Sequence, residues 1–540
     1  MKRKLLKRLM ATVVPALLAP SIPALAEDTF PEYSFSADDC VREQPEGELK
    51  TYQRDGGNLK SYLGGVAAGE QNGLKMDLVF ADDGKTVWFH NLVSTAQDCF
   101  VWTKGEIRDD RIVIPQGTPM WFYDFGTYTT AYVLCNLKEN PDSDPSSPDG
   151  FECIPGDIEF SYVDGVVKLL PNSSGIAAVG LQRYSTDPFI IDNGFNYKWL
   201  GYGDINSEYT VFDEIPVSEP KDTGSAARYA FTYKSEPGGA TCGHLVDVLE
   251  EDGKLRVRGL SQIFGSDYWT TADMVGNKVI FPAKQYLGID RDGYDDFFLY
   301  LCSSRMSTDG EYFWMDFADD TVFERDETTG VMTSDESLIM NRGGEMLLIG
   351  DWWMDMRLAP YEEKAVMPAS PSIGAYYEYD EYMEQCRVSV EIPCLDVDGN
   401  FIDPANLYFQ MYINGEVYTF EPSDYHYFEL PEPMTELPYG FTCYEIYMYS
   451  TGMWSIDFFG EEPETIGVQT ISKAGGETMM SDVVTFVTTG VENVSASEEI
   501  VSERYFNLSG MPVGEDYKGV VIRNTRYADG SSVNTKLMRR

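Results

Sequence analysis

The three histidines of this 540-residue chain are its candidate bases for a serine or cysteine nucleophile. His90 falls in an alternating strand pattern, His244 comes just before one, and His426 stands between two tyrosines. Nucleophilic catalysis needs a serine or cysteine held by a base that a third group orients, and no Gly-x-Ser-x-Gly segment is present. The zinc spacings His-Glu-x-x-His and Cys-x-x-Cys are absent as well. We therefore predict structural or surface histidines and assign no catalytic residue.

Calcium is the one cofactor that the sequence suggests. Asp396, Asp398 and Asn400 alternate around Gly399, and Asp403 follows, which places oxygen atoms as a calcium loop does. The glutamate that closes such a loop at its twelfth position is missing. A plain β-turn explains the same residues and is the favoured interpretation, as it is for the looser stretch 290–296.

Two further places are candidates for binding a ligand. Trp352-Trp353 could offer a flat ring to a sugar, but neighbouring strand residues point to opposite faces, so core packing is the favoured role. Asp142 and Asp144 lie in a loop rich in Pro, Ser and Asp, 140–156, and loops often carry binding residues. A solvated acidic insert is the alternative for this loop.

These candidates sit on a chain that repeats itself. Residues 79–115 return in similar form from Asp247, and the pairs Trp102/Trp269, Pro115/Pro282 and Cys135/Cys302 all share an offset of 167. The sequence therefore predicts two tandem antiparallel β-meander modules, 51–217 and 228–367, with barrel and sandwich both open. Matching Phe160 to Phe317 lowers the offset to 157 and predicts about ten extra residues in the first module.

Composition favours an all-β fold. Aromatic residues make up 14% of the chain, and 48 glycines and 28 prolines suit many short strands joined by turns. Residues 372–490 space out four strand patterns like a small antiparallel sandwich. Within them, IGVQTISKAGGETMMSDVV resembles the closing hairpin of fibronectin type III-like domains.

The amino-terminal residues 1–26 have the form of a signal peptide. A basic start precedes a short apolar run broken by prolines, and Ala24-Leu25-Ala26 offers a small-x-small cleavage site. We expect export, a mature chain that opens with an acidic lead-in, 27–50, and no transmembrane segment, since no later run reaches about 20 apolar residues.

The carboxyl-terminal region 491–540 differs from the acidic body, because Ile500–Arg540 carries seven basic and four acidic residues. Tyr505, the Gly519–Ile522 strand and a basic end resemble the C-terminal sorting region of type IX (Por) secretion substrates, although Val521 stands where that family usually has an aromatic residue. The resemblance implies the type IX machinery as a partner and an extracellular or outer-membrane location. Without sorting, the location would be the periplasm. The body resembles uncharacterised exported tandem β-repeat proteins, a family without an established active site.

Charge disfavours some partners. The net charge is −47, and removal of the signal peptide with its five basic residues makes it −52, which disfavours nucleic acid and anionic lipid as partners of the body, and we predict no nucleic-acid partner. Nine cysteines leave at least one thiol unpaired. Cys135 and Cys302 are predicted as core thiols, whereas Cys386, Cys394 and Cys443 could supply one disulfide.

These observations favour a secreted or cell-surface, non-catalytic β-protein that binds a glycan or a host-surface protein. Repeated modules suit binding because two weak sites raise each other's effective concentration. Two alternatives stay open: a secreted glycoside hydrolase whose carboxylate pair is unidentified, and a structural component of a surface assembly.

Overall fold

The structure, a computed structural model, describes only part of the chain. The described residues are 30–62, 65–96, 99–143, 150–217, 219–290, 297–308, 312–343, 349–380, 385–425, 430, 432–488, 500–506, 513–514, 517–527 and 532–539. The predicted signal peptide, 1–26, lies outside them. The chain divides into two compact units, one built mainly from residues up to 366 and the other mainly from residue 367 onward, and each is described by itself.

The all-β class is confirmed. Described helical segments are limited to α2 (Pro188–Asp192) and the short 3-10 turns Ala37–Asp39, Thr223–Ser225 and Pro404–Asn406. None of the described helices has the length and apolar character needed to cross a membrane.

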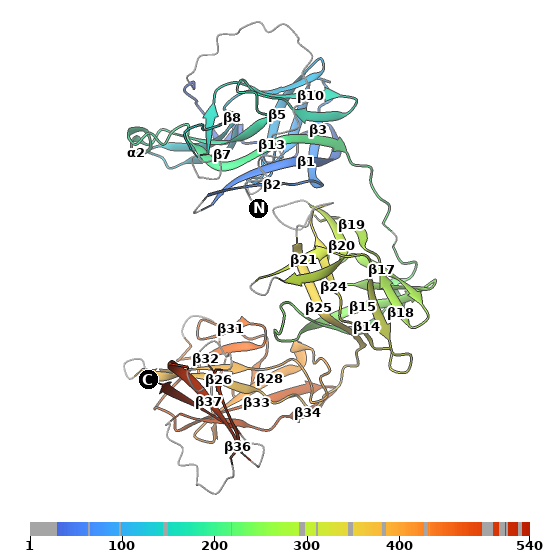
Figure 1. Ribbon diagram of the computed structural model, residues 1–540, viewed down its shortest axis with the longest axis vertical. Helices are drawn as coiled ribbons and strands as arrows, with labels where there is room; N and C mark the ends of the chain where they lie inside the picture. The colour runs from blue at the N-terminus through green and yellow to red at the C-terminus, as the bar shows by residue number, and fades with distance from the viewer. Residues whose placement is uncertain are drawn as a thin grey trace. The chain divides into compact units, whose positions relative to one another are not determined.

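The first module closes into a ring of antiparallel strands. The first and last strands, β1 and β13, pair with each other from Tyr52 opposite Val211 to Lys60 opposite Tyr202, and Figure 1 shows them side by side. The ring is a barrel whose strands are, in order, β1 (Glu48–Tyr62), β3 (Leu74–Phe80), β4 (Thr86–His90), β5 (Trp102–Arg108), β6 (Arg111–Ile114), β10 (Ile158–Val163), β11 (Val166–Leu169) and β13 (Trp199–Val211).

Further strands extend the same sheet beyond the ring. They are β12 (Ala178–Ser185), β8 (Thr129–Glu139) and β7 (Pro119–Asp124) in a row from β13, β9 (Phe151–Ile154) on β8, and β2 (Gly65–Glu70) on β1. The ring interior is filled by side chains such as Phe89, whose ring lies 5.3 Å from that of Phe160 between centroids.

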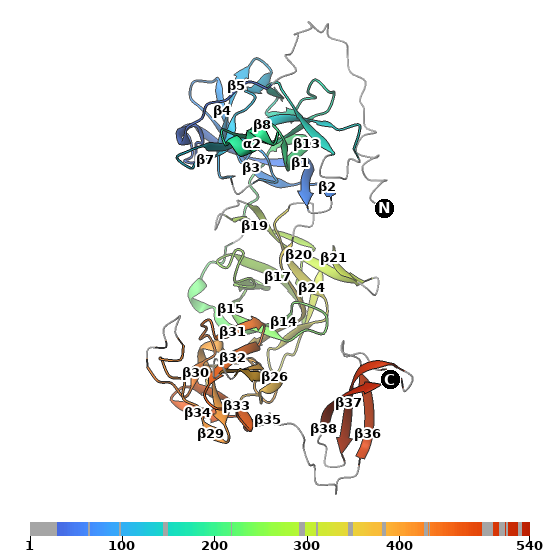
Figure 2. The same cartoon turned by 90° about the vertical axis from the view of Figure 1, so that its left-hand side faces the viewer.

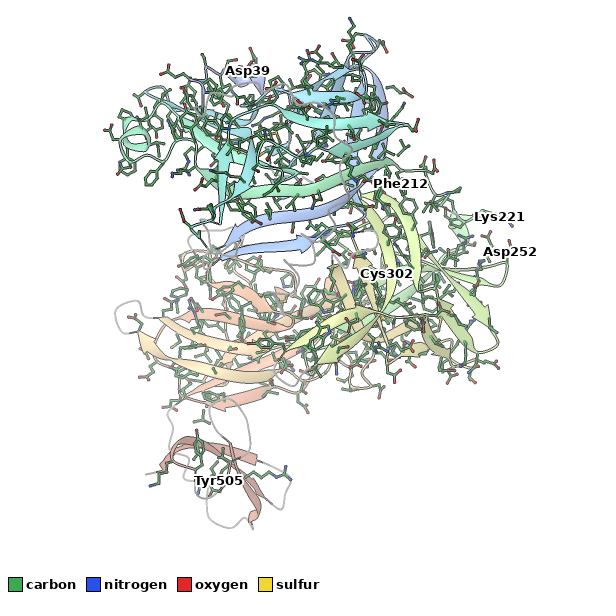
Figure 3. All side chains as sticks on the ribbon, turned by 45° about the horizontal axis from the view of Figure 1, so that its top comes forward. Asp39, Phe212, Lys221, Asp252, Cys302 and Tyr505 are labelled. Carbon is green, nitrogen blue, oxygen red and sulfur yellow. The ribbon has the colours of Figure 1, made fainter. Side chains whose placement is uncertain are left out.

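The second module repeats this strand order. Its ring, closed by β14 and β25, consists of β14 (Ala227–Lys234), β15 (Cys242–Glu251), β16 (Lys254–Arg258), β17 (Trp269–Val275), β18 (Lys278–Phe281), β22 (Thr321–Arg325), β23 (Met332–Ser334) and β25 (Ile349–Pro360). The extension consists of β24 (Ser337–Asn341), β20 (Phe297–Thr308), β19 (Lys284–Asp290) and β21 (Phe313–Phe317). In the linker before β14, Lys221 forms a 2.5 Å ion pair with Asp252 of the β15–β16 turn (Figure 3).

The offset of 167 relates equivalent strands. Trp102 and Trp269 open β5 and β17, and both are buried. One predicted match is wrong: Phe317 belongs to β21, which pairs with β20 as β9 pairs with β8. Ile112 pairs with Phe160 and its counterpart Val279 pairs with Phe323, so the true offset there is 163. Four residues, not ten, are therefore added in the first module.

The strands between Ser372 and Val487 form a two-sheet domain, the third domain of the chain. One sheet runs β26-β27-β32-β31, and the ring of Trp454 in β32 lies 5.7 Å from that of Phe409 in the other sheet, so the two sheets face each other. The first sheet contains β26 (Ser372–Asp380), β27 (Gln385–Glu391), β32 (Met453–Phe459) and β31 (Ile446–Ser450). The second contains β29 (Glu416–Val417), β28 (Leu407–Ile413), β33 (Thr465–Ala474) and β34 (Glu477–Met480), with β30 (Leu437–Pro438) on β28 and β35 (Val484–Val487) on β33.

The carboxyl-terminal region forms a three-stranded antiparallel sheet of its own. Strand β37 (Gly519–Tyr527) lies between β36 (Ile500–Phe506) and β38 (Ser532–Arg539), as Figure 2 shows. The side chain of Val521, in the central strand, is buried.

Candidate binding surface

The sheet β26-β27-β32-β31 has one apolar and one polar, aromatic face. Alternate residues of a strand point to opposite faces, so Val388 and Val390 of β27 are buried while Arg387 and Ser389 point the other way. We call this second side the tyrosine face. Its residues are Tyr377, Gln385, Arg387, Ser389, Tyr447, Tyr449, Ser455 and Asp457.

Strand register sets these residues in two rows across the sheet. In one row Tyr377 is opposite Arg387, which is opposite Asp457. In the next row Ser389 is opposite Ser455, which is opposite Tyr447. Side chains directly across antiparallel strands lie about 5 Å apart at their Cβ atoms, so the rows form one continuous surface. A hollow of about 490 Å³ lies on it, lined by Tyr377, Asp380, Gln385, Cys386, Arg387, Ser389, Tyr447, Tyr449 and Ser455.

An ion pair fixes the centre of the tyrosine face. Arg387 Nε and Nη2 donate to the two carboxylate oxygens of Asp457 at 2.5 and 2.8 Å, and the Gln385 amide donates to the same carboxylate. The carboxylate is almost completely buried, whereas the Arg387 side chain is partly exposed. Hydrogen bonding to Asp457 raises the pKa of Arg387, so the guanidinium stays charged. Two parallel hydrogen bonds also hold its plane in one orientation.

Three tyrosines surround this pair and present their rings to solvent. The exposed fractions are 56% for Tyr377, 37% for Tyr447 and 52% for Tyr449. The hydroxyls of Tyr449 and Ser389 lie 2.6 Å apart in a hydrogen bond, which restrains one ring. The face thus combines apolar ring surfaces with hydroxyl, amide and guanidinium groups within one shallow hollow, the mixture that small-molecule sites use for contact and orientation.

The predicted tryptophan pair does not form a surface site. Trp353 is completely buried in the second module and packs edge-on against Phe231, with ring centroids 5.8 Å apart. Trp352 points to the other face, where its indole N–H donates to the Ser235 carbonyl and its ring packs against a second cluster of buried residues. The opposite orientations follow from strand alternation, and neither indole joins the other in one platform.

The predicted calcium loop is organised by its own hydrogen bonds. The Asp396 carboxylate accepts from the backbone N–H of Asp398 at 2.9 Å, from that of Asn400 at 2.7 Å and from the Asn400 amide at 3.1 Å. Arg357 donates to the Asn400 side-chain oxygen at 2.9 Å. These N–H donors are hydrogen-bonded to the Asp396 and Asn400 oxygens that a calcium ion would need as ligands. The arrangement is typical of an Asx turn. Across the residues that the structure describes, no group of three His, Cys, Asp or Glu is placed to hold a metal ion.

The remaining sequence candidates are dispersed. Asp142 is exposed just after β8, while Asp144 lies outside the described residues, as does His426. His90 stacks on Trp102 with ring centroids 4.6 Å apart. His244 is buried with its Nε2 2.8 Å from the Gly259 carbonyl, and burial lowers its pKa, so it stays neutral at physiological pH.

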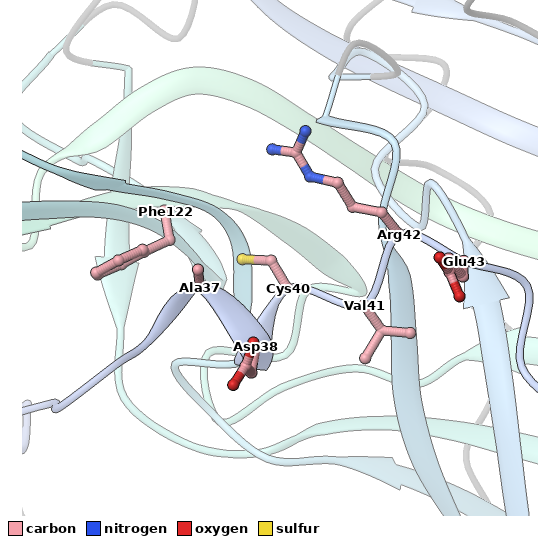
Figure 4. A pocket seen from close by; sticks show the side chains of 7 residues that line it. All are labelled: Ala37, Asp38, Cys40, Val41, Arg42, Glu43 and Phe122. Carbon is pink, nitrogen blue, oxygen red and sulfur yellow. The ribbon is translucent and has the colours of Figure 1, made fainter.

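A hollow of about 510 Å³ lies on the first module beside the 3-10 turn Ala37–Asp39 (Figure 4). It contains a possible nucleophile, Cys40, together with Asp38, Arg42, Glu43 and Phe122. Burial raises the pKa of the Cys40 thiol to about 11, so it is protonated at neutral pH and a poor nucleophile. Cys40 is therefore not an activated thiol.

One carboxylate of the second module gives a pH-dependent prediction. Burial raises the pKa of Asp351, which accepts a 3.0 Å hydrogen bond from the Ser261 hydroxyl. Folding favours the neutral form of the Asp351 carboxyl. The resulting contribution to the free energy of unfolding is therefore present below about pH 4 and is lost as pH rises through the raised pKa. Asp351→Asn should therefore gain stability relative to wild type as pH rises from about 4 to 7.5. Urea unfolding of both proteins across this range measures the difference, and a pH-independent difference would contradict the expectation.

The tyrosine face has a recognisable pattern in the sequence. Tyrosines are concentrated in the segments Tyr376–Tyr382 and Tyr444–Tyr449, and Tyr447 and Tyr449 have the two-residue spacing that puts strand side chains on one face. The sequence alone does not show that these two segments belong to one sheet. Comparison with protein-family models and with curated proteins finds no match to this chain.

Proposed function

We propose that this chain is an exported, non-catalytic β-protein that binds a neutral saccharide on the tyrosine face of its third domain. The observation that carries the proposal is the hollow in which Tyr377, Tyr447 and Tyr449 surround the fixed Arg387–Asp457 pair. A sugar ring has an apolar C–H face that packs on an aromatic ring and hydroxyls that need both donors and acceptors. The tyrosine face supplies both.

A neutral ligand is favoured over an acidic one by charge. The chain carries a net charge of −47, which disfavours approach of anionic sugars. The Arg387 charge is matched by Asp457 at hydrogen-bond distance, so the hollow offers directed donors without a net positive charge at this pair.

The carboxylates that line a hollow on the second module do not favour the alternative function of a glycoside hydrolase. A hollow of about 700 Å³ there is lined by Glu324, Asp335, Glu336 and Asp355, but by no aromatic residue. This hollow therefore offers no ring on which a sugar could stack. Glycosidases need both a carboxylate pair and a sugar-binding surface in one cleft.

The chain's ends support a location at the cell surface. The predicted signal peptide and the resemblance to a type IX sorting region both point to export. In the third domain, the strand orders β26-β27-β32-β31 and β29-β28-β33-β34 support a fibronectin- or immunoglobulin-type sandwich, a scaffold common in surface proteins.

A glycan array probed with the fluorescently labelled full chain tests the proposal. We expect signals from neutral glycans that disappear with Tyr377→Ala/Tyr447→Ala, because the variant removes two of the three exposed rings. Circular dichroism and a thermal scan verify folding of both proteins. A blank array with folded wild-type protein, or binding unchanged in the double variant, would refute saccharide binding at this face.

A further inference from the structure

Two thiols of the first module lie in direct contact. Cys135 Sγ and Cys153 Sγ are 3.1 Å apart, although all nine cysteines are free thiols in the structure. Sulfur atoms in a disulfide are about 2.05 Å apart, so an approach of roughly 1 Å would suffice to join them. Cys135 was predicted as an isolated core thiol, and the structure adds a partner that its sequence context did not reveal.

The hairpin β8–β9 brings the two cysteines together. Leu137 is opposite Cys153 in the register, and Cys135 lies two residues along β8 on the same face as Leu137. Cys135 is buried, whereas Cys153 is partly exposed near the end of the four-residue strand β9. A short strand of this kind can shift by the small distance that bond formation needs.

The second module has only half of this arrangement. Cys302 is the counterpart of Cys135, but Phe317 takes the place of Cys153, because it is opposite Ser304 as Cys153 is opposite Leu137. The second cysteine thus occurs in the module whose β8–β9 connection is the loop rich in Pro, Ser and Asp. Cys302, which has no cysteine at the position equivalent to Cys153, therefore serves as an internal control for thiol chemistry at Cys135.

We propose that Cys135 and Cys153 form a disulfide that closes this loop in the oxidised protein. The oxidant is a disulfide, either of a thiol oxidase or of a small molecule such as oxidised glutathione. The more exposed Cys153 attacks it as thiolate, one sulfur of the oxidant leaves as a thiol, and a mixed disulfide forms. Burial raises the pKa of Cys135, so this thiol gives its proton to the departing sulfur as it displaces it, and two protein thiols become one S–S bond while the oxidant gains two electrons and two protons.

Closing the loop should restrict the unfolded chain and so stabilise the first module. It would also tether the segment that carries the exposed Asp142. Reduction is expected to lower the melting temperature of the first module by several degrees, since a loop of this size removes appreciable chain entropy.

Peptide mapping of the full chain tests the disulfide directly. After incubation with oxidised glutathione, alkylation and tryptic digestion without reductant, we expect one cross-linked species that joins peptides 112–138 and 139–168, each of which contains a single cysteine. The peptide 292–305 with Cys302 should appear alkylated and unlinked after unfolding. Cys135 and Cys153 recovered as alkylated thiols, or Cys153 recovered only as its glutathione adduct, would overturn the proposal.

A thermal scan with and without dithiothreitol gives a second readout. The wild type should melt at a lower temperature when reduced, Cys302→Ser should keep that difference, and Cys153→Ser should lose it. A reductant effect that persists in Cys153→Ser would assign the stabilisation to other cysteines and contradict the proposal.

Discussion

Replacing Arg54 by leucine is expected to destabilise the first module by about 3–5 kcal/mol. Arg54 and Asp204 are both completely buried inside the ring, with Arg54 Nη2 3.0 Å from Asp204 Oδ1. Without the arginine, Asp204 stays buried, and among the described residues the hydroxyl and N–H of Ser94 remain as its hydrogen-bond donors. Burial already raises the pKa of Asp204, which shows how unfavourable the charged form is there.

The second module shows how the same positions can be filled without charge. Phe231 takes the place of Arg54 in β14, and Trp353 takes the place of Asp204 in β25, where it is opposite Leu338 as Asp204 is opposite Val179. Buried ion pairs can often be replaced by apolar residues at little cost. Arg54→Leu/Asp204→Leu should therefore recover at least half of the loss caused by Arg54→Leu alone.

Calorimetry of the full chain, with the first module's transition assigned by hydrogen exchange of β13 amides, measures these effects. Lys168→Leu is the matched control, because it breaks an exposed ion pair with Glu208 in the same module and should cost less than about 1 kcal/mol. A cost for Arg54→Leu no larger than that of the control would show that the buried pair contributes little.

The second large effect is expected from Arg387→Ala in the third domain. Among the described residues, the variant leaves the buried Asp457 carboxylate with Gln385 as its side-chain donor, at a cost of about 2–3 kcal/mol, between the values for exposed and fully buried pairs because Arg387 is partly exposed. It also removes a donor from the hollow, so saccharide affinity should fall. Hydrogen exchange of β27 and β32 amides reports the stability loss.

Arg387→Lys separates charge from geometry. Lysine keeps the positive charge but cannot form two parallel hydrogen bonds, so both the stability loss and the affinity loss should be intermediate. Equal behaviour of lysine and arginine would contradict a role for the fixed guanidinium plane.

The repeat made much of the local fold predictable. The pairs Trp102/Trp269 and Cys135/Cys302 located equivalent strands because buried residues and turns recur where the same pairings recur. Ring closure was not predictable, since β1 and β13 are joined by pairing across about 150 residues and periodicity carries no information on such partners. The match of Phe160 to Phe317 failed because an aromatic residue alone does not distinguish β10 from β9.

The candidate site was less predictable than the fold. Tyr377 and Tyr447 are distant in sequence and reach one face only because β27 and β32 pair between their strands. Trp353 has the residue type of a sugar-stacking site, but its position in the strand places its side chain in the core. Asp396 had the right residue type for calcium, but two backbone N–H groups donate to its Oδ1 and the Asn400 amide donates to its Oδ2.

Titration of the best neutral glycan from the array into wild type, Tyr447→Ala and Tyr312→Ala tests saccharide binding on the tyrosine face most directly. Tyr312 is an exposed tyrosine of the second module and serves as the control. Loss of one stacking ring should weaken binding by about tenfold, equivalent to ~1.4 kcal/mol, in Tyr447→Ala, and Tyr312→Ala should bind like wild type. Equal affinity of wild type and Tyr447→Ala would contradict the account.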